Sequence, residues 1–461
     1  MAFAITMKSG PFFPQTERGG TMRILWASVR DLRRDLCATT QASLVKGLAE
    51  RGHDVTFVSP GSASETIEGV EHVSLSVKTR PGRRSRAIAN GILARWAELG
   101  EHDMMLVEWP ILRRLHRAGV LDDVPWLLVD RSPPADDGFL ARLHWFVWRR
   151  AWRLARKAGR KHAGPVGTAV SKAHRRHVQS FTKLKDEQVT VIQAGVDLRR
   201  FLPGPERRST ERTLHLVYHG RLDRNRGVLA LPMVQQKAKN AGLGVTLTLM
   251  GEGDALGALS RMAKGSDDVH VLGRLPQDKV AHRLGTSHLG LLPMPEHRAW
   301  SLASPLKRSE YLASGLLVAG IDHDGHRLAG DAPFMHLFAK EDFHDGIIDL
   351  LNRMTRDPSI YVEGKRAARR YADDHLGWTH SVDALHAAIE ERVTVEGPQT
   401  KAVPGFAGEP TPAPEPVAEP VKAPDVVAPP VAVEAEPESV PEPAPEPVQA
   451  AEKPTGPRRK I

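Results

Sequence analysis

Residues 214–227 read LHLVYHGRLDRNRG, a short apolar run that leads directly into a loop with three arginines, two of which, Arg221 and Arg226, lie five residues apart. The first five residues favour a β-strand, and a helical pattern begins after the final glycine. A loop between a parallel strand and a helix lies at the carboxyl edge of an α/β sheet, where ligands bind. Backbone N–H groups at a helix start favour an anion, and the arginine fork grips phosphate oxygens. The stretch therefore predicts an α/β sheet with a phosphate site, and an exposed basic turn is the alternative.

The rest of the chain repeats this alternation of short apolar runs and longer helical patterns. Strands are predicted at residues 23–28, 54–59, 103–108, 125–130 and 167–171, and in a second set that starts at Leu214 and continues at 245–251, 269–273, 289–293 and 316–320. The alternation is typical of doubly wound parallel sheets. We therefore expect an α/β chain with two Rossmann-like domains, joined near residues 203–212, that face a central ligand cleft.

Length and composition limit the class of protein. With 461 residues and 41% hydrophobic content, the chain can build two domains with separate cores. The single cysteine, Cys37, excludes an intramolecular disulfide framework and a cysteine-based zinc site, and it suits a reducing compartment. There is no apolar run of about 18 residues, and the first 21 residues lack the apolar core of a signal peptide. A cytoplasmic location is expected.

The net charge of +9 hides an uneven distribution. From Glu396 onward there are 11 acidic and 6 basic residues, a balance of −5, so the preceding 395 residues carry +14. The same C-terminal segment holds 17 of the 35 prolines, in repeats such as PAPEPVAEP. Such a composition buries too little apolar surface to fold and favours extended polyproline conformations. A disordered tail rich in proline and glutamate is therefore predicted over residues 396–461.

Several spaced segments carry a family resemblance. They are VSKAHRRHV (170–178), VIQAGVDLRRF (191–201), YHGRLDRNRG (218–227), LMGEGD (249–254), VLGRLP (271–276) and SPLKRSEYLASGLLVAG (304–320). In order and spacing they resemble the retaining nucleotide-sugar glycosyltransferases of the GT-B fold (glycosyl transferases group 1), which include glycogen-synthase-like and mannosyltransferase-like enzymes. Ala194 stands where these relatives usually have asparagine, and Arg226 where a lysine is usual. The resemblance covers roughly residues 22–393.

The resemblance also implies how the chain is divided. The expected parts are a flexible N-terminal extension (1–21), an N-terminal Rossmann-like acceptor domain (22–203), a C-terminal Rossmann-like nucleotide-sugar domain (204–375), a closing helix that returns to the first domain (376–395) and the disordered tail (396–461). In the closing helix an apolar face is predicted to run through Val382, Leu385, Ala388 and Ile389.

The donor side of the expected site follows from the same motifs. The residues assigned to donor binding are Arg221, Arg226, Leu272, Ser304, Leu306, Lys307 and Glu310. Sugar transfer requires stabilisation of the negative charge on the leaving diphosphate, which arginine, lysine and backbone donors provide without a metal. By resemblance Glu310 accepts hydrogen bonds from the ribose hydroxyls, and a solvated helix glutamate is the alternative. Leu302 stands where many relatives have a first glutamate. No cofactor and no metal are expected.

The acceptor side is expected in the N-terminal domain. Asp130 and Arg131 follow a predicted strand in VDRSPPADDG (129–138) and are assigned as catalytic or acceptor-side residues. The alternative for Asp130 is that it caps a turn. Glu108, at the end of the preceding strand, is a comparable candidate. By resemblance a retaining transfer needs no protein nucleophile, so no pair of catalytic carboxylates is predicted.

Residues 139–162 form a basic strip. They include three tryptophans (Trp145, Trp148 and Trp152) and eight arginines and lysines, with no acid. Tryptophan beside cations on an amphipathic helix suits an anionic bilayer surface, which predicts peripheral contact with the inner face of the cell membrane and a lipid-linked acceptor. In the alternative, the tryptophans pack into the core and the cations are solvated.

Two further function classes remain open at this level. A GT-B-like protein without activity could serve as a scaffold that binds a partner through its proline-rich tail. The basic charge could instead bind nucleic acid, although there is no recognised nucleic-acid motif. The expected partners are a nucleotide-sugar and an acceptor, which is lipid-linked or a polysaccharide, and no nucleic acid is expected.

Overall fold

The computed structural model describes residues 20–32, 38–61, 67–77, 83–134, 139–160, 164–205, 213–328, 330 and 332–396. The described residues all belong to one compact unit. The predicted disordered tail, from residue 397 onward, and nearly all of the predicted N-terminal extension lie outside them.

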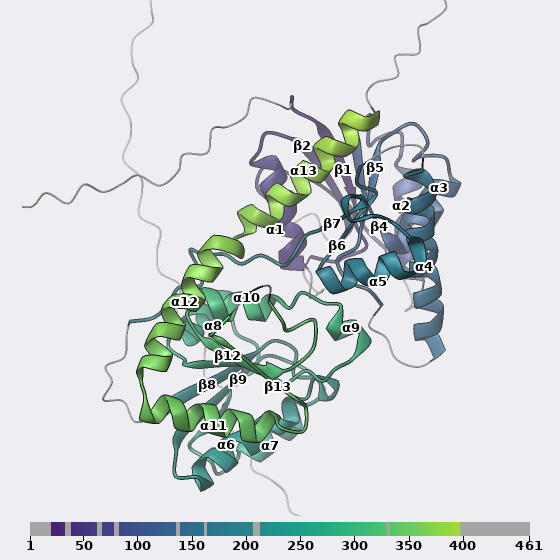
Figure 1. The fold of residues 1–461 in the computed structure, drawn as a ribbon. Coiled ribbons are helices and arrows are strands. Elements are labelled where there is room, and N and C mark those ends of the chain that lie inside the picture. Colours follow the sequence, from purple (N-terminus) through teal and green to yellow (C-terminus); the bar gives the residue numbers. More distant parts are fainter. Residues whose placement is uncertain are drawn as a thin grey trace, which may run out of the picture. The chain divides into compact units, whose positions relative to one another are not determined.

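The first sheet contains seven parallel strands in the order β3-β2-β1-β4-β5-β6-β7 (Figure 1). The strands are β1 (Arg23–Ala27), β2 (Asp54–Pro60), β3 (Glu71–Leu75), β4 (Met104–Glu108), β5 (Trp126–Val129), β6 (Gly167–Ala169) and β7 (Val189–Val191). The helices between them are α1 (Ala38–Ala49), α2 (Arg84–Ala94), α3 (Trp109–Arg117), α4 (Phe139–Ala158) and α5 (Lys172–Thr182). Every residue of β4 and β5 is buried, as expected for strands that helices cover on both faces.

The second sheet contains six parallel strands in the order β10-β9-β8-β11-β12-β13. The strands are β8 (Thr213–His219), β9 (Gly244–Met250), β10 (Val269–Val271), β11 (Leu289–Leu292), β12 (Leu317–Ile321) and β13 (Met335–Phe338). Its helices are α6 (Leu231–Asn240), α7 (Leu256–Ala263), α8 (Gln277–Gly285), α9 (Arg298–Ser301), α10 (Leu306–Ala313), α11 (Phe343–Arg356) and α12 (Ser359–His375). In both sheets the strand order reverses next to the first strand, β1 or β8, which is where doubly wound sheets open a ligand crevice.

The predicted fold class, two Rossmann-like parallel sheets, is confirmed, and a strand forms at each of the ten predicted positions. Three further strands, β3, β7 and β13, were not predicted. All three lie at the edge of a sheet, and β3 and β13 are only partly buried. An edge strand buries less side-chain surface than a central one, so its sequence lacks the continuous apolar run that identifies the others.

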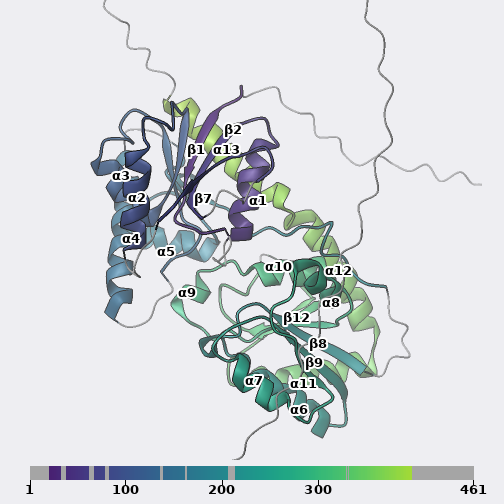
Figure 2. The same cartoon turned by 180° about the vertical axis from the view of Figure 1, so that it is seen from behind.

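The last helix, α13 (Trp378–Glu396), packs on α1 and on the first sheet (Figure 2). Its predicted apolar face is buried there: Val382, Leu385, Ala388 and Ile389 join the core around β1 and β2. At Gly47 of α1, an added Cβ atom would lie only 2.4 Å from a methyl group of Val382. Glycine at this position therefore permits the close approach of the two helices.

The tryptophans of the basic strip point into the core of the first sheet. Trp148 and Trp152 of α4 are fully buried, and Trp145 packs partly buried against the same cluster. The structure therefore agrees with the alternative prediction for these tryptophans, in which they pack into the core and do not face a bilayer. Among the described side chains of α4, the large apolar ones that are exposed are Leu143 and Phe146 instead.

Two glycines allow the carboxyl ends of β8 and β9 to meet. Gly251 has φ of +142°, and a Cβ atom added to it would lie 1.7 Å from the carbonyl oxygen of Gly220. Gly220 has φ of +117° and donates its N–H to Met250 at 2.9 Å. The loop that carries Arg221 therefore begins where two backbones touch.

Replacement of Gly251 tests this constraint. We expect Gly251→Ala to destabilise the protein by about 1–3 kcal/mol, since the new methyl group collides with backbone in a conformation that L residues rarely adopt. The melting temperature from circular dichroism measures the loss. Gly257→Ala is the matched control, because its Cβ would meet only a side-chain nitrogen of Arg261 at 3.7 Å inside α7. Equal melting temperatures for the two variants would contradict the expectation.

Candidate functional site

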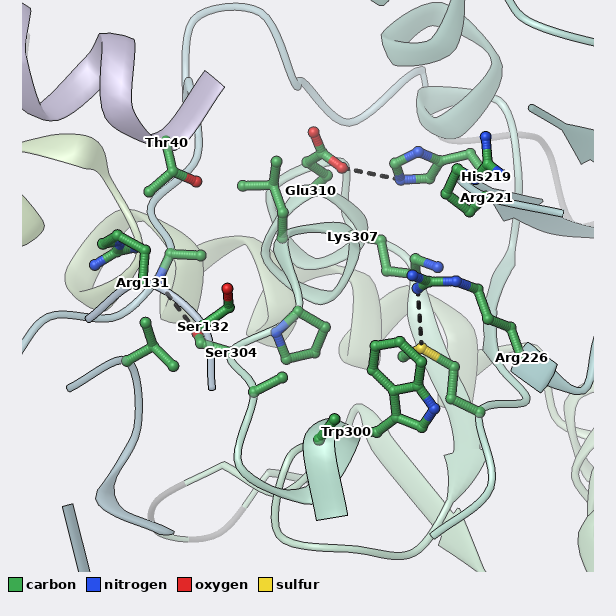
Figure 3. Close-up of a pocket in the computed structure, with 18 of the residues that line it drawn as sticks. Thr40, Arg131, Ser132, His219, Arg221, Arg226, Trp300, Ser304, Lys307 and Glu310 are labelled. Atoms are coloured by element: carbon green, nitrogen blue, oxygen red, sulfur yellow. Dashed lines mark hydrogen bonds and ion pairs between the residues drawn. The ribbon is translucent and has the colours of Figure 1, made fainter. Parts of the chain in front are cut away.

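A cavity of about 370 Å³ lies where loops from the carboxyl edges of both sheets meet (Figure 3). Its first-sheet side is lined by Thr40, Arg131, Ser132, Pro133, Val170 and Ala194. Its second-sheet side is lined by His219, Gly220, Arg221, Arg226, Leu275, Gln277, Val280, Met294, Ala299, Trp300, Ala303, Ser304, Pro305, Leu306, Lys307 and Glu310. We call it the donor cavity. Six of the seven predicted donor residues line it; the seventh, Leu272, does not.

Asp223 holds two of the three arginines of the loop after β8, Arg221 and Arg226. Its carboxylate accepts hydrogen bonds from Arg221 at 2.8 and 3.2 Å and from Nε of Arg226 at 3.4 Å. Although burial raises the pKa of Asp223, its hydrogen bond to Arg221 and the charges of both arginines bring that pKa below the ordinary value. One ionised side chain therefore orients two guanidinium groups. Asp223 was quoted in the loop motif but was not predicted as a functional residue.

Lys307 places a third cation on the same wall from the first turn of α10. The side chain is 8% exposed, and its Nζ donates to the Tyr218 hydroxyl at 2.9 Å, which in turn donates to the carbonyl of Arg221 at 2.8 Å. Burial, followed by the nearby charge of Arg226, lowers the pKa of the Lys307 ammonium to about 7. An anion in the cavity would favour its protonated form.

Glu310 lies one turn further along α10 and is 5% exposed. Because it is buried, the solvated-glutamate alternative is wrong. Its Oε2 lies 3.0 Å from Nε2 of His219, whose ring packs edge-on against Tyr311 with centroids 5.4 Å apart. Among the described lining residues Glu310 is the only carboxylate, so a ligand meets mainly positive charge in this cavity.

Trp300 of α9 forms the end of the cavity away from Glu310 in the view of Figure 3. The guanidinium of Arg226 lies over its ring, 4.5 Å from the centroid, and also contacts the sulfur of Met294 at 3.8 Å. A cation over an indole face is held by the negative face of the ring. Neither Trp300 nor His219 was predicted for the site. The only sequence signal is that Trp300 shortly precedes the SPLK motif and His219 directly precedes Gly220.

The opposite wall consists of the loop after β5. Arg131 is 8% exposed, and its guanidinium donates to the carbonyl of Ile192 at 2.8 Å. Next to it, the hydroxyl of Ser132 accepts from Arg30 at 2.7 Å. The structure places the predicted Arg131 on the donor cavity, together with Ser132, which was not predicted.

Asp130 was predicted beside Arg131, but its carboxylate lies in the core and does not line the donor cavity. It is fully buried and accepts from the indole N–H groups of Trp148 and Trp152, the latter at 2.8 Å. Nε2 of His174 lies 3.1 Å from the same carboxylate oxygen. Successive side chains of an extended backbone point to opposite sides, so Asp130 turns inward while Arg131 turns to the cavity.

Two other carboxyl-edge residues also lie outside the lining. Glu108 is buried, and it accepts from the Ser28 hydroxyl at 2.8 Å and the Val29 N–H at 3.0 Å, so it anchors the loop after β1. Burial raises the pKa of Glu108 even though the charge of Arg30 opposes that change. Leu272 is 36% exposed, while Leu275 of the same loop reaches the cavity.

The buried ammonium of Lys307 makes stability depend on pH. Its pKa is about 7 in the folded protein and 10.5 in the ordinary unfolded state, so between these values the unfolded state binds more protons and this group's contribution to stability rises with pH. The variant Lys307→Met lacks this group. We expect the free energy of unfolding of the native protein, minus that of Lys307→Met, to rise by about 2 kcal/mol between pH 7 and pH 9. Urea unfolding over this range measures the gain. The exposed control is Lys264→Met. If the native protein shows the same gain relative to Lys264→Met as relative to Lys307→Met, Lys307 is not the source of the pH dependence.

Residues 38–200 match the model of Glycosyltransferase Family 4. No curated protein sequence matches the chain. Among solved structures, sucrose-phosphate synthase from Thermosynechococcus elongatus is similar with a TM-score of 0.63 and 15% identity, over 79% of this chain and 98% of that one.

Two further structures align over the same share, 79% of this chain and 98% of theirs, each with a TM-score of 0.58 and 14% identity. They are WaaG, a glycosyltransferase involved in lipopolysaccharide biosynthesis, and HepE from Anabaena in complex with UDP and glucose. At these identities the likeness concerns the fold. The chain therefore has the GT-B fold of the glycosyl transferases group 1.

Proposed function

We propose that this chain is a retaining glycosyltransferase of the hexosyltransferase type that moves a sugar from a nucleotide-sugar to an acceptor. The proposal rests on the donor cavity, in which Arg221, Arg226 and Lys307 form one wall and Glu310 is the single carboxylate among the described lining residues. Three cations on a cavity wall suit a diphosphate, and a carboxylate suits a ribose diol. The complexes of HepE with UDP and UDP-glucose support this type of donor.

The order of these residues along the cavity gives the donor a direction. In Figure 3, Glu310 lies toward one end and Trp300 toward the other, with Lys307 and Arg226 between them. A donor with its ribose at Glu310 and its diphosphate at Arg226 would extend its sugar toward Trp300. The acceptor would then approach from the wall of Arg131 and Ser132.

The proposed chemistry uses the side chains of the chain itself. The bond between the anomeric carbon and the diphosphate oxygen breaks as the acceptor hydroxyl oxygen bonds the same carbon from the same face. The negative charge that develops on the departing phosphate oxygen in the transition state faces Arg221, Arg226 and Lys307, and the hydroxyl proton then passes to that oxygen. Preorganised donors of this kind stabilise developing charge strongly in a site that excludes water. The proposal includes no metal and no other cofactor. In the described part of the chain, no three metal-ligating side chains form a group that could hold an ion.

Donor binding by the full chain tests the proposal. UDP-, GDP- and ADP-sugars are screened by thermal shift, and the released nucleoside diphosphate is assayed alongside. We expect one donor to stabilise the protein and to be hydrolysed slowly. Arg226→Ala and Glu310→Gln should each weaken its binding about ten- to hundredfold, the value of a hydrogen bond to a charged group.

Arg356→Ala and Glu341→Gln are the matched controls, since both side chains are exposed on or next to α11. They should leave donor affinity unchanged. Binding without turnover would favour a scaffold that has kept only the donor site. The nucleic-acid alternative would be favoured if the protein bound nucleic acid with an affinity that falls steeply with salt and is unchanged in both site variants.

We further propose that the acceptor is lipid-linked and that the protein works in the cytoplasm at the inner face of the membrane. The outward side of α4, which we call the α4 face, consists of Leu143, Phe146, Arg150, Arg153 and Lys157, spaced three or four residues apart. Leu143 and Phe146 are 53% and 49% exposed. The described helices include none that has the length and apolar character to cross a bilayer. Membrane contact through this face would therefore be peripheral.

Cations of α3 reinforce the α4 face. The positive charges of Arg117 and then Arg150 lower the pKa of Arg113, so the three groups repel one another. Within the described residues no carboxylate pairs with any of them. Arg150 lies over the Phe146 ring, 5.2 Å from its centroid. A cationic surface with exposed apolar side chains suits anionic lipid headgroups.

Vesicle flotation tests the α4 face. We expect the protein to float with phosphatidylglycerol-containing vesicles and to stay behind with pure phosphatidylcholine. The double variant Arg150→Gln, Arg153→Gln should bind about thirtyfold more weakly, because each basic residue contributes about 1 kcal/mol. Arg261→Gln with Arg356→Gln removes the same charge from α7 and α11 and should bind like the native protein. Equal flotation with both kinds of vesicle would rule out the electrostatic account.

A further inference from the structure

A second cavity, of about 290 Å³, shares Ala303 and Ser304 with the donor cavity. The rest of its lining comes from α5, from the linker after β7, from α10, from the loop after β12 and from α12. These residues include Lys172, Arg176, Gln193, Arg308, Asp324 and Arg327. The proposed transfer reaction uses none of them.

The lining of the second cavity carries more positive than negative charge. It has four basic side chains and one acid, Asp324. The carboxylate of Asp324 already pairs with Arg176 at 2.9 Å and with Arg327 at 3.3 Å, and Arg327 pairs with Asp322 as well. Lys172 and Arg308 have no carboxylate partner within the described residues. Two positive charges at the cavity are therefore left without a counter-charge.

Arg308 is the more informative of the two, because it is only 4% exposed. One of its terminal nitrogens donates to three consecutive backbone carbonyls, those of Gly325, His326 and Arg327, at 2.9 to 3.2 Å, while its Nε has no partner. Burial lowers the pKa of the guanidinium to about 10. Keeping a charge buried without an opposite charge is costly, and an anion in the cavity would offset that cost.

The start of α5 adds donors on the other side of the cavity. Ser171 caps this 11-residue helix by accepting the N–H of His174 at 3.0 Å. The first N–H groups of a helix have no partner within the helix, and here they belong to Lys172 and Ala173, which both line the cavity. The partial positive charge of a helix start favours an anion. The helix start and the buried Arg308 are independent features of the same cavity.

We propose that the second cavity binds a phosphate group, held by Arg308, by Lys172 and by the first N–H groups of α5. Two full cations and the partial charge of the helix start match a doubly charged phosphate better than a singly charged group. The hydroxyl of Tyr371 and the amide of Gln193 supply further hydrogen-bonding groups on the lining. The site is separate from the proposed donor site, and because Ser304 lies on both cavities, a bound phosphate would contact the loop that forms the donor wall.

Calorimetric titration of the full chain tests this site, first with inorganic phosphate and then with soluble dihexanoyl phosphatidic acid. All proteins carry Arg226→Ala, which weakens phosphate binding in the donor cavity. Lys172→Glu reverses an exposed charge and leaves the core untouched, so it should fold. We expect it to weaken binding of the phosphate probe at least tenfold. Lys185→Glu is the matched control, because Lys185 is also exposed and lies just beyond the far end of α5, and it should bind like the parent protein.

The two probes distinguish the source of the phosphate. Similar affinities for both would indicate a free phosphate compound, and at least tenfold tighter binding of the phosphatidic acid would indicate a lipid headgroup. Loss of all binding in the Arg226→Ala parent, or affinities that Lys172→Glu leaves unchanged, would overturn the proposal. Neither probe requires sugar transfer, so the phosphate site can fail while the proposed function stands, and the reverse also holds.

Discussion

Parallel strand pairing organises both sheets and sets the edge at which their loops leave. β1 pairs with β2 and β4, and β8 pairs with β9 and β11, all in parallel, so the loops that follow these strands leave at the same edge of each sheet. Residues far apart in the chain meet there for that reason. Arg221 follows β8 and Glu310 lies between β11 and β12, yet both line one cavity. At this edge the backbones of Gly220 and Gly251 are in contact, so the loop after β8 can begin there, but a side chain at residue 251 would not fit.

The cationic side chains at this edge have one feature in common: they are partly or fully buried and they line a cavity. Asp223 orients Arg221 and Arg226, while the Lys307 ammonium donates to a tyrosine hydroxyl and has no carboxylate partner within the described residues. Arg308 is also buried, and its direct partners are backbone carbonyls. Buried charge without an equal counter-charge lowers stability. A ligand that supplies negative charge would offset this cost, which is why these residues mark two candidate sites.

More of the lining residues were predicted from the sequence on the second-sheet side of the donor cavity than on the first-sheet side. Arg226, Lys307 and Glu310 lie in short motifs whose spacing to a strand or helix start sets the direction of the side chain. Asp130 and Arg131 differ in a way that spacing could not resolve, because the choice of which neighbour faces the core depends on the indoles of α4 that lie behind β5. A strand pattern alone has no information on that packing.

Local sequence patterns were enough to predict the fold class, the positions of the central strands and the cationic character of the loop after β8. These are local properties, since apolar runs, turn residues and charges act over a few neighbouring positions. Three other features depend on how the chain packs: His219 pairs with Glu310, Trp300 lies under the guanidinium of Arg226, and Lys172 and Arg308 line one cavity. Those contacts join segments up to 136 residues apart. They arise because the carboxyl edges of the two parallel sheets border common cavities. A local sequence pattern extends over a few residues and therefore cannot predict such contacts.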